Sequence, residues 1–304
     1  MKKIVITGGA GFIGSHLAHH LSGSYRVTVL DDLSTGDRSN LDGIDCEFIE
    51  GSILDTPLVD SVLQDTRYVF HLAAMVSVAE SMTKARDCVT QNVTGLLNVL
   101  DAAVKHGVGK VVLASSAAVY GNSPQSPKRE SDLPAPESPY AITKLDGEFY
   151  LEMYRKAHGL ASAAPRFFNV YGPRQNPAGA YAAVVPIFVS RALAGEKITV
   201  FGDGNQTRDF VSVLDVVSGI QQAAETPEIS GPFNLACGEA TSLNDLISTI
   251  LELTGSSSEV VYEDPRPGDI RHSLADISRA RAFGIKPENR LKETIGKMLP
   301  ATTN

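Results

Sequence analysis

The sequence predicts an α/β fold in which a doubly wound parallel sheet is joined to a smaller C-terminal α/β lobe. The first observation is a short β-branched strand, residues 3–7, which leads into a glycine-rich turn and a helix. The second is the alternation of strand and helix patterns up to about residue 165, which is typical of a parallel sheet covered on both faces. The third is a set of polar residues at the strand ends, where ligands bind in such sheets.

Strands and helices follow one another in order through the first half of the chain. After the strand 3–7 we expect a helix at 15–21, a strand at 26–30, a strand at 47–50, a helix at 57–64, a strand at 68–73, a long helix at 87–106, a strand at 111–114 and a second long helix at 139–157. Residues 1–165 are therefore expected to form a nucleotide-binding domain.

Periodicity weakens in residues 166–304, and the loops lengthen. Helices are expected at 181–193, 215–224 and 242–254, and short strands at 198–201, 208–211 and 273–275. Long loops in a compact protein are often functional, so this lobe is expected to bind the substrate. The two domains are expected to interleave near the C-terminus.

The glycine-rich turn carries the first chemical signal. Gly8, Gly11 and Gly14 keep the backbone free of side chains where a pyrophosphate would approach, and the following helix N-terminus favours its charge. Asp31 ends the next strand, at about the spacing of the acid that binds ribose hydroxyls. An acid there repels the 2′-phosphate of NADP, so the predicted cofactor is NAD. Arg38 is interpreted as a loop charge.

Tyr140 and Lys144 carry the second signal. They lie four residues apart in a helix that begins at Pro139, so they share one face. A lysine ammonium beside a phenol is expected to lower the pKa of the tyrosine, which would make Tyr140 a general base near neutral pH. Ser116, at a strand end, is placed to bond the same substrate hydroxyl. The spacing alone more often marks a surface pair, and the dinucleotide turn is what favours catalysis.

Composition narrows the choice of partners and compartment. The chain has 304 residues, is 43% hydrophobic and carries a formal net charge of −8, which argues against nucleic acid or an anionic membrane as partner. Its three cysteines lie far apart and form no metal spacing, which suggests a reducing compartment. We therefore expect a soluble, cytoplasmic protein without a metal. His71 lies in an apolar strand and is interpreted as a core histidine.

Five segments together resemble the extended short-chain dehydrogenase/reductase family: Thr7–Gly14, His71–Ala74, Ser115–Ser116, Val119–Gly121 and Tyr140-x-x-x-Lys144. Within that family the chain is similar, from Lys2 to about Phe283, to UDP-glucose 4-epimerases and their UDP-N-acetylglucosamine relatives. The resemblance implies a Rossmann fold, bound NAD and a UDP-sugar substrate. It also implies a homodimer paired through the helices 87–106 and 139–157.

The resemblance assigns cofactor contacts residue by residue. They are Gly8, Gly11, Phe12, Ile13, Gly14, Asp31, Asp32, Ser52, Ile53, Leu72, Ala73, Ala74, Ser115, Tyr140 and Lys144. Ser52 departs from the family, which usually has an aspartate near the adenine at this position. Backbone contacts or packing by Ile53 are expected to replace that interaction.

The substrate contacts implied in the same way are Ser116, Asn169, Val184, Val200, Phe201, Arg208, Arg266, Asp269 and Ser273. Arg208 and Arg266 are the expected diphosphate partners, because guanidinium groups match phosphate oxygens. Asn169 is expected near the diphosphate or sugar, and Asp269 near the uridine ribose or Arg266. The three apolar side chains are expected to flank the uracil. Arg174, Arg191 and Arg271 are interpreted as solvated charges.

The implied function is 4-epimerisation of UDP-glucose and UDP-galactose on NAD. Ser273 stands where members restricted to these sugars tend to have tyrosine, so N-acetyl sugars are expected as second substrates. Dehydratases of the family carry an Asp-Glu pair just after the strand-end serine or threonine, where this chain has Ala117 and Ala118. A UDP-glucuronate 4-epimerase or another NAD-dependent nucleotide-sugar enzyme is left open, with a non-catalytic NAD-binding scaffold as the remote alternative.

Overall fold

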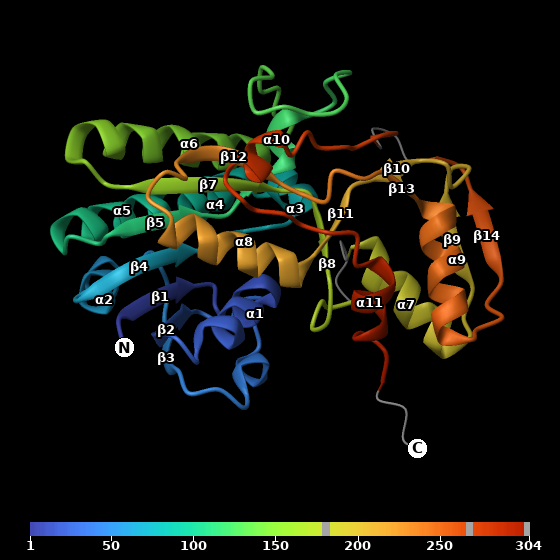
Figure 1. Ribbon diagram of the computed structural model, residues 1–304, viewed down its shortest axis with the longest axis horizontal. Helices are drawn as coiled ribbons and strands as arrows, with labels where there is room; N and C mark the ends of the chain where they lie inside the picture. The colour runs from blue at the N-terminus through green and yellow to red at the C-terminus, as the bar shows by residue number, and fades with distance from the viewer. Residues whose placement is uncertain (178–182, 266–269, 301–304) are drawn as a thin grey trace.

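The computed structural model describes residues 1–177, 183–265 and 270–300 (Figure 1). Its main sheet has the strand order β12-β7-β5-β4-β1-β2-β3, with the short β6 paired to β7. These strands are β1 Lys3–Thr7, β2 Arg26–Asp31, β3 Glu47–Glu50, β4 Thr66–His71, β5 Lys110–Leu113, β6 Ser115–Ser116, β7 Ser162–Phe167 and β12 Gly231–Leu235. All pair in parallel, and the order reverses at β1. The predicted doubly wound sheet is confirmed.

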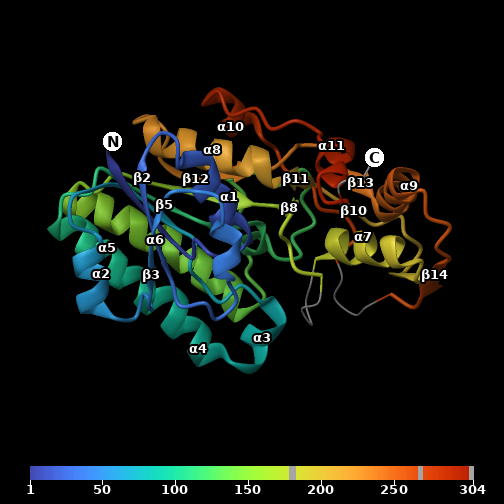
Figure 2. The ribbon, with the colours of Figure 1, turned by 90° about the horizontal axis from the view of Figure 1, so that it is seen from below.

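Helices cover both faces of this sheet (Figures 1 and 2). Alternating side chains of β1 show why: Ile4 and Ile6 enter one core cluster, and Val5 enters the other. The first cluster is closed by α1 (Phe12–Leu21) and α8 (Val213–Glu225). The second is closed by α2 (Thr56–Val62), α5 (Gly95–Lys105) and α6 (Pro139–His158).

The long helix expected at 87–106 is interrupted, which corrects the sequence prediction. Its segments are α4 (Ala85–Val89), a π-helical turn (Thr90–Thr94) and α5. Asn92 lies in the wider turn, where its Oδ1 accepts a hydrogen bond from Met75 N at 2.7 Å and its Nδ2 donates to Thr143 Oγ1 at 3.0 Å. These contacts join the loop after β4 to α6, and they give the π turn a partner on each side. A further helix, α3 (Val78–Thr83), precedes α4.

The C-terminal lobe has its own core. Its elements are α7 Val184–Ala194, β9 Ile198–Phe201, α9 Leu243–Thr254, β14 Val260–Glu263 and α11 Leu291–Gly296, and they surround a third apolar cluster. β14 pairs with β9 in parallel. The chain also returns to the first half, because α8 packs on the main sheet and β12 extends it. Between β12 and α11 lies α10 (Ser278–Ala282).

The strand expected at 208–211 is two strands. β10 (Thr207–Arg208) pairs with β13 (Thr241–Ser242), whereas β11 (Phe210–Ser212) pairs with β8 (Asn169–Tyr171). The division falls at Asp209, whose fully buried carboxylate accepts hydrogen bonds from the backbone N–H groups of Cys237, Gly238 and Ala275. The strand expected at 273–275 is reduced to isolated bridges at His272 and Ala275.

Within the described ranges, no helix combines the length and apolar character needed to cross a bilayer. The same residues contain no cluster of three or more His, Cys, Asp or Glu side chains that could hold a metal ion.

Candidate active site

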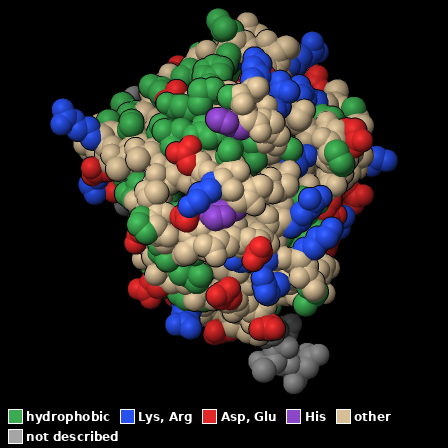
Figure 3. Space-filling view, turned by 90° about the vertical axis from the view of Figure 1, so that its left-hand side faces the viewer, with side chains coloured by type: hydrophobic (Ala, Val, Ile, Leu, Met, Phe, Trp, Pro, Cys, Tyr) green, Lys and Arg blue, Asp and Glu red, His purple; other side chains and the backbone are tan. Residues whose placement is uncertain are grey.

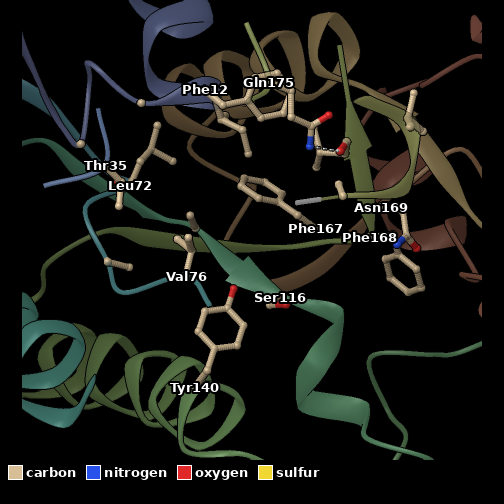
Figure 4. Close-up of a pocket in the computed structure, with 18 of the residues that line it drawn as sticks. Phe12, Thr35, Leu72, Val76, Ser116, Tyr140, Phe167, Phe168, Asn169 and Gln175 are labelled. Carbon is tan, nitrogen blue, oxygen red and sulfur yellow. Dashed lines mark hydrogen bonds between the residues drawn. The ribbon is translucent and has the colours of Figure 1, made fainter. Parts of the chain in front are cut away.

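A cavity of about 1090 Å³ lies along the carboxyl ends of β1, β2, β4 and β5, and α7 and β9 of the C-terminal lobe line its other side. A second hollow, which we call the smaller pocket, has a volume of about 360 Å³. The two share Ser116, Phe167, Phe168, Asn169 and Arg208 in their walls. Figure 4 shows Tyr140 and Ser116 facing this space from one side and Phe167 and Asn169 from the other.

The glycine-rich turn, Gly8 to Gly14, forms a concave backbone surface, which we call the cradle. Side chains at Gly8 and Gly14 would collide with neighbouring backbone atoms. Gly8 has φ +70°, and a Cβ built on it would lie 2.6 Å from Ala73 N. A Cβ on Gly14 would lie 2.1 Å from Gly8 O. α1 begins at Phe12, three residues earlier than expected, so the N–H groups of its first turn lie at the cavity. This end of the cavity suits a pyrophosphate.

Asp31 holds the edge of this cradle. Its Oδ2 accepts a hydrogen bond from Ala10 N and its Oδ1 accepts one from Leu33 N, both at 2.9 Å. Burial raises the pKa of this carboxyl, and the two amides act against the rise. Asp32 is exposed beside it and also lines the cavity. Arg38 instead places its guanidinium over the Phe48 ring, 5.0 Å from the centroid. The charges at this end fit a dinucleotide with free ribose hydroxyls.

Ser116, Tyr140 and Lys144 line the large cavity, and Ser116 also lines the smaller pocket. Ser138 fixes the start of α6 by accepting a hydrogen bond from Ala141 N at 3.2 Å, and Pro139 occupies the first turn. Lys144 Nζ donates to the carbonyl of Ala114 at 2.8 Å and lies 5.7 Å from the centroid of the Tyr140 ring. Burial lowers the pKa of Lys144 to about 8.

The expected lowering of the Tyr140 pKa is wrong for the protein alone. Burial raises the pKa of Tyr140, and a hydrogen bond with Ser116 offsets this rise only in part. The sequence argument considered the nearby lysine without the loss of water around the phenol. His71 is buried, its Nδ1 lies 2.9 Å from Thr7 Oγ1, and burial lowers its pKa to about 3. It is a neutral core histidine, as interpreted from its strand.

Most of the residues that the sequence assigned to the cofactor or the substrate line the same cavity. The large cavity is lined by Gly8, Gly11, Phe12, Ile13, Gly14, Asp31, Asp32, Ile53, Leu72, Ala73, Ala74, Ser115, Ser116, Tyr140, Lys144, Asn169, Val184, Val200, Phe201 and Arg208. Ser273 lines the smaller pocket instead. Ser52 lines neither, because its hydroxyl turns back to accept a hydrogen bond from Leu54 N at 3.2 Å. Arg266 and Asp269 lie outside the described residues.

Other lining residues escaped the sequence argument. On α7, Ile187 and Arg191 follow the assigned Val184 at helical spacing and also line the cavity, a pattern that the sequence does contain. Arg191, interpreted as a solvated charge, donates to Lys197 O at 2.9 Å and lines the cavity. Gln91 reaches the cavity from the π turn, and no pattern in the sequence predicts that turn.

Ala117 and Ala118 follow Ser116 in a short 3₁₀ turn, Ala117–Tyr120, and both line the smaller pocket. Among the described residues of that pocket there is no Asp or Glu. The part of the site around Ser116 therefore has a hydroxyl, a phenol and a lysine, but no carboxyl group of the described residues in the smaller pocket.

Comparisons with known proteins agree with this geometry. A UDP-glucose 4-epimerase of Mycolicibacterium smegmatis is 40% identical over 304 aligned residues, covering 97% of this chain and 96% of that protein. A solved UDP-N-acetylglucosamine 4-epimerase from Methanobrevibacter ruminantium M1, in complex with UDP-N-acetylmuramic acid, superposes with a TM-score of 0.95 at 38% identity, covering 98% of this chain and 96% of the other. A UDP-glucose 4-epimerase from Thermotoga maritima with UDP-glucose gives 0.92 at 39% identity, covering 97% of both.

Dehydratases are also similar: a dTDP-glucose 4,6-dehydratase from Streptomyces antibioticus is 32% identical over 98% of this chain and 91% of its own length. The family described as "NAD dependent epimerase/dehydratase family" matches residues 4–236. The chain therefore belongs to the NAD-dependent epimerase/dehydratase family, and its cofactor is NAD.

Proposed function

We propose that this protein is a UDP-hexose 4-epimerase that interconverts UDP-glucose and UDP-galactose. One observation carries the proposal. Ser116, Tyr140 and Lys144 line one cavity with the dinucleotide cradle, whereas the positions after Ser116 hold Ala117 and Ala118. This set of groups can move a proton to and from a hydroxyl, and it supplies no further acid there.

When bound, NAD supplies a reversible hydride acceptor for C4 of the sugar. Tyr140, as its phenolate, removes the proton of the 4-hydroxyl and later returns it, while Ser116 orients that hydroxyl. Because burial raises the pKa of Tyr140, this role requires positive charge beside the phenol. Lys144, anchored on the Ala114 carbonyl, supplies positive charge beside the phenol and is placed to hold a ribose hydroxyl. The 4-keto sugar must present its opposite face before the proton and hydride return. The cycle is redox-neutral, so the cofactor can stay bound.

The remaining substrate contacts follow from the cavity walls. Arg208 lies where both hollows meet and is assigned to the diphosphate, with Asn169 beside it. Val184 at the start of α7 and Val200 and Phe201 on β9 form the apolar wall assigned to the uracil. The UDP-glucose that the Thermotoga relative binds has the same parts, a uracil, a diphosphate and a hexose.

A 4,6-dehydratase is the rival that the same family contains. It must also remove the C5 proton and protonate the leaving 6-hydroxyl, and alanine can do neither. Because Ala117 and Ala118 occupy the turn beside Ser116, the geometry favours epimerisation over dehydration.

The test is to incubate the purified protein separately with UDP-glucose, UDP-N-acetylglucosamine, UDP-glucuronate and dTDP-glucose, and to separate the products. UDP-galactose from UDP-glucose is the expected result, with the Tyr140→Phe variant as the inactive control. A 4-keto-6-deoxy sugar as the main product would identify a dehydratase and overturn the proposal.

We also propose that two copies pair through the helices at 85–105 and 139–158. On the second of these helices Leu151 and Tyr154 are core, but Phe149 is 64% exposed. Met153 on α6 and Val89 on α4 are also exposed. Figure 3 shows hydrophobic side chains gathered in the upper part of one face of the molecule. An apolar surface of this kind is typical of an interface between subunits.

A further inference from the structure

The smaller pocket contains a lysine for which the reaction has no use. Lys128 lines this pocket together with Ser116 and Ala118, and only 5% of its surface is exposed. It lies outside every motif of the family resemblance, in the long connection between the 3₁₀ turn and α6.

The backbone of Lys128 is held firmly. Its N–H donates to Leu274 O at 2.8 Å, and its carbonyl accepts hydrogen bonds from Asp276 N at 2.8 Å and from Asn234 Nδ2 at 2.9 Å. Lys128 and Ala275 thus form a parallel bridge, two residues from Ser273. This position is fixed by two other segments of the chain, at Asn234 and at Leu274–Asp276, so the lysine is a built part of the pocket wall.

The ammonium of Lys128 has an incomplete set of partners. It donates a hydrogen bond to Ser123 O, and no carboxylate of the described residues forms an ion pair with it. Burial lowers its pKa, and the field of Asp132 acts against this effect. Burying an ammonium without an anion costs free energy, so such groups usually have a paired charge. An anionic group on a ligand in the pocket would supply it.

The sugar is the part of the substrate that reaches this pocket. Ser116 and Asn169 belong to both hollows, and Ser116 is the proposed partner of the reacting 4-hydroxyl. The described residues of the smaller pocket include no Asp or Glu, so none of their side chains would repel a carboxylate. A negative group carried on the hexose ring near C4 would therefore enter a region whose described walls contain Lys128 and no acidic side chain.

We propose that the smaller pocket is an anion subsite in which Lys128 pairs with a carboxylate on the hexose, so that the enzyme epimerises UDP-glucuronate as well as UDP-glucose. This inference rests on the proposed 4-epimerase function. The chemistry is unchanged: hydride leaves C4 and returns to it, the 4-hydroxyl proton passes through Tyr140, and no carbon is lost. The product is UDP-galacturonate.

Three substrates isolate the carboxylate. UDP-glucuronate, UDP-glucose and UDP-xylose carry at C5 a carboxylate, a hydroxymethyl group and a hydrogen, respectively. Wild type is expected to epimerise UDP-glucuronate with a kcat/KM no more than about 10-fold below that of UDP-glucose. UDP-xylose separates the loss of the charge from the loss of C6 itself.

Two variants isolate the charge. Lys128→Gln keeps a donor for Ser123 O and removes the ammonium, and Lys128→Met removes both. Either variant should lower kcat/KM for UDP-glucuronate about 10-fold or more, which corresponds to the loss of a hydrogen bond to a charged group. The kcat/KM values for UDP-glucose and UDP-xylose should change less than about 3-fold. Lys286→Met, an exposed lysine in neither hollow, is the charge-matched control. Thermal unfolding of each variant shows that it is folded.

The outcomes separate the two proposals. If wild type converts UDP-glucose but neither converts nor binds UDP-glucuronate, the anion subsite is wrong and the 4-epimerase stands. Equal losses on all three substrates in both variants would make Lys128 structural and would also overturn the subsite. A third outcome is that no sugar is epimerised, but calorimetry shows that both UDP-sugars bind. If Lys128→Gln then weakens the binding of UDP-glucuronate by about 10-fold or more and leaves the binding of UDP-glucose unchanged, the subsite stands and the proposed function fails.

Discussion

The carboxylate of Glu148 on α6 accepts hydrogen bonds from Nε and Nη2 of Arg166 on β7, at 2.9 and 2.7 Å, in a position where both side chains are at most 5% exposed. Ser115 also donates to this carboxylate, and the guanidinium lies over the Tyr120 ring at 4.8 Å. Glu148 follows Lys144 by one helical turn. The ion pair therefore fixes the helix that carries the proposed catalytic groups against the strand end that carries Ser116.

Removing one partner of this pair is expected to destabilise the protein strongly. Glu148→Ala leaves Arg166 buried with an uncompensated charge, and breaking such pairs costs about 3–5 kcal/mol. Chemical denaturation of wild type and variant measures the difference. Glu152→Ala, one turn further along α6 in an exposed pair with Arg155, is the matched control and should change stability little. Equal losses in the two variants would contradict the role of burial.

Tyr140→Phe should abolish turnover while UDP-sugar and NAD still bind. The phenol is the group that exchanges a proton with the substrate, so its loss should reduce kcat by about 10²-fold or more. The ring is kept, and its packing with it. Steady-state rates and binding by calorimetry check both parts. Activity within a few-fold of wild type would remove Tyr140 from the mechanism.

Asp31→Asn should weaken discrimination against NADP. The amide oxygen keeps only one of the two hydrogen bonds from Ala10 N and Leu33 N, and the negative charge at the ribose end is gone. The ratio of NADP to NAD dissociation constants is expected to fall about 10-fold, an effect the size of one charged contact. A wild-type preference for NADP would contradict the role given to Asp31.

The sequence predicts best what neighbouring residues decide. β1 and β3 have the bounds expected from their β-branched and apolar pattern, and the turn from Gly8 to Gly14 has the expected place. Strand-end logic brought Ser116 and the glycine turn to one cavity, because the carboxyl ends of parallel strands share an edge, and Tyr140 reaches the same cavity from α6.

What the sequence could not predict depends on contacts between distant segments. The π turn depends on Asn92 meeting Met75 and Thr143. β12 joins the main sheet beside β7, although β12 begins 64 residues after the end of β7. No local pattern indicates that pairing. The pKa of Tyr140 follows from burial, which the Tyr-x-x-x-Lys spacing does not record. Lys128 becomes notable only because Leu274 and Asp276 enclose it.

Phe149→Glu should convert the proposed dimer to a monomer. A charge at the centre of an apolar interface loses its water without gaining a partner. Sedimentation velocity of wild type and variant is the measurement. Leu133→Glu is the control, because Leu133 is also exposed but lies in the connection before α6 and on neither helix. A monomeric wild type, or a Phe149→Glu variant that is still dimeric, would contradict the interface.

Ser273→Tyr should abolish epimerisation of UDP-N-acetylglucosamine and spare that of UDP-glucose. Ser273 lines the smaller pocket, and its N–H donates to Thr207 O at 3.1 Å, which fixes where its side chain begins. A tyrosine ring there fills space that an N-acetyl group needs, whereas the serine leaves it open. An open pocket admits the larger sugar without rejecting the smaller, because a missing group costs only its lost contacts, ~1–3 kcal/mol for an apolar one.

The measurement is kcat/KM for UDP-glucose and UDP-N-acetylglucosamine in wild type, Ser273→Tyr and Ser273→Ala. The alanine variant keeps the space and removes the hydroxyl, so it should retain most activity on the N-acetyl sugar and lose only what a hydrogen bond to the amide contributes, about 0.5–1.5 kcal/mol. A wild type inactive on UDP-N-acetylglucosamine, or a tyrosine variant that still uses it well, would show that Ser273 does not control the choice of sugar.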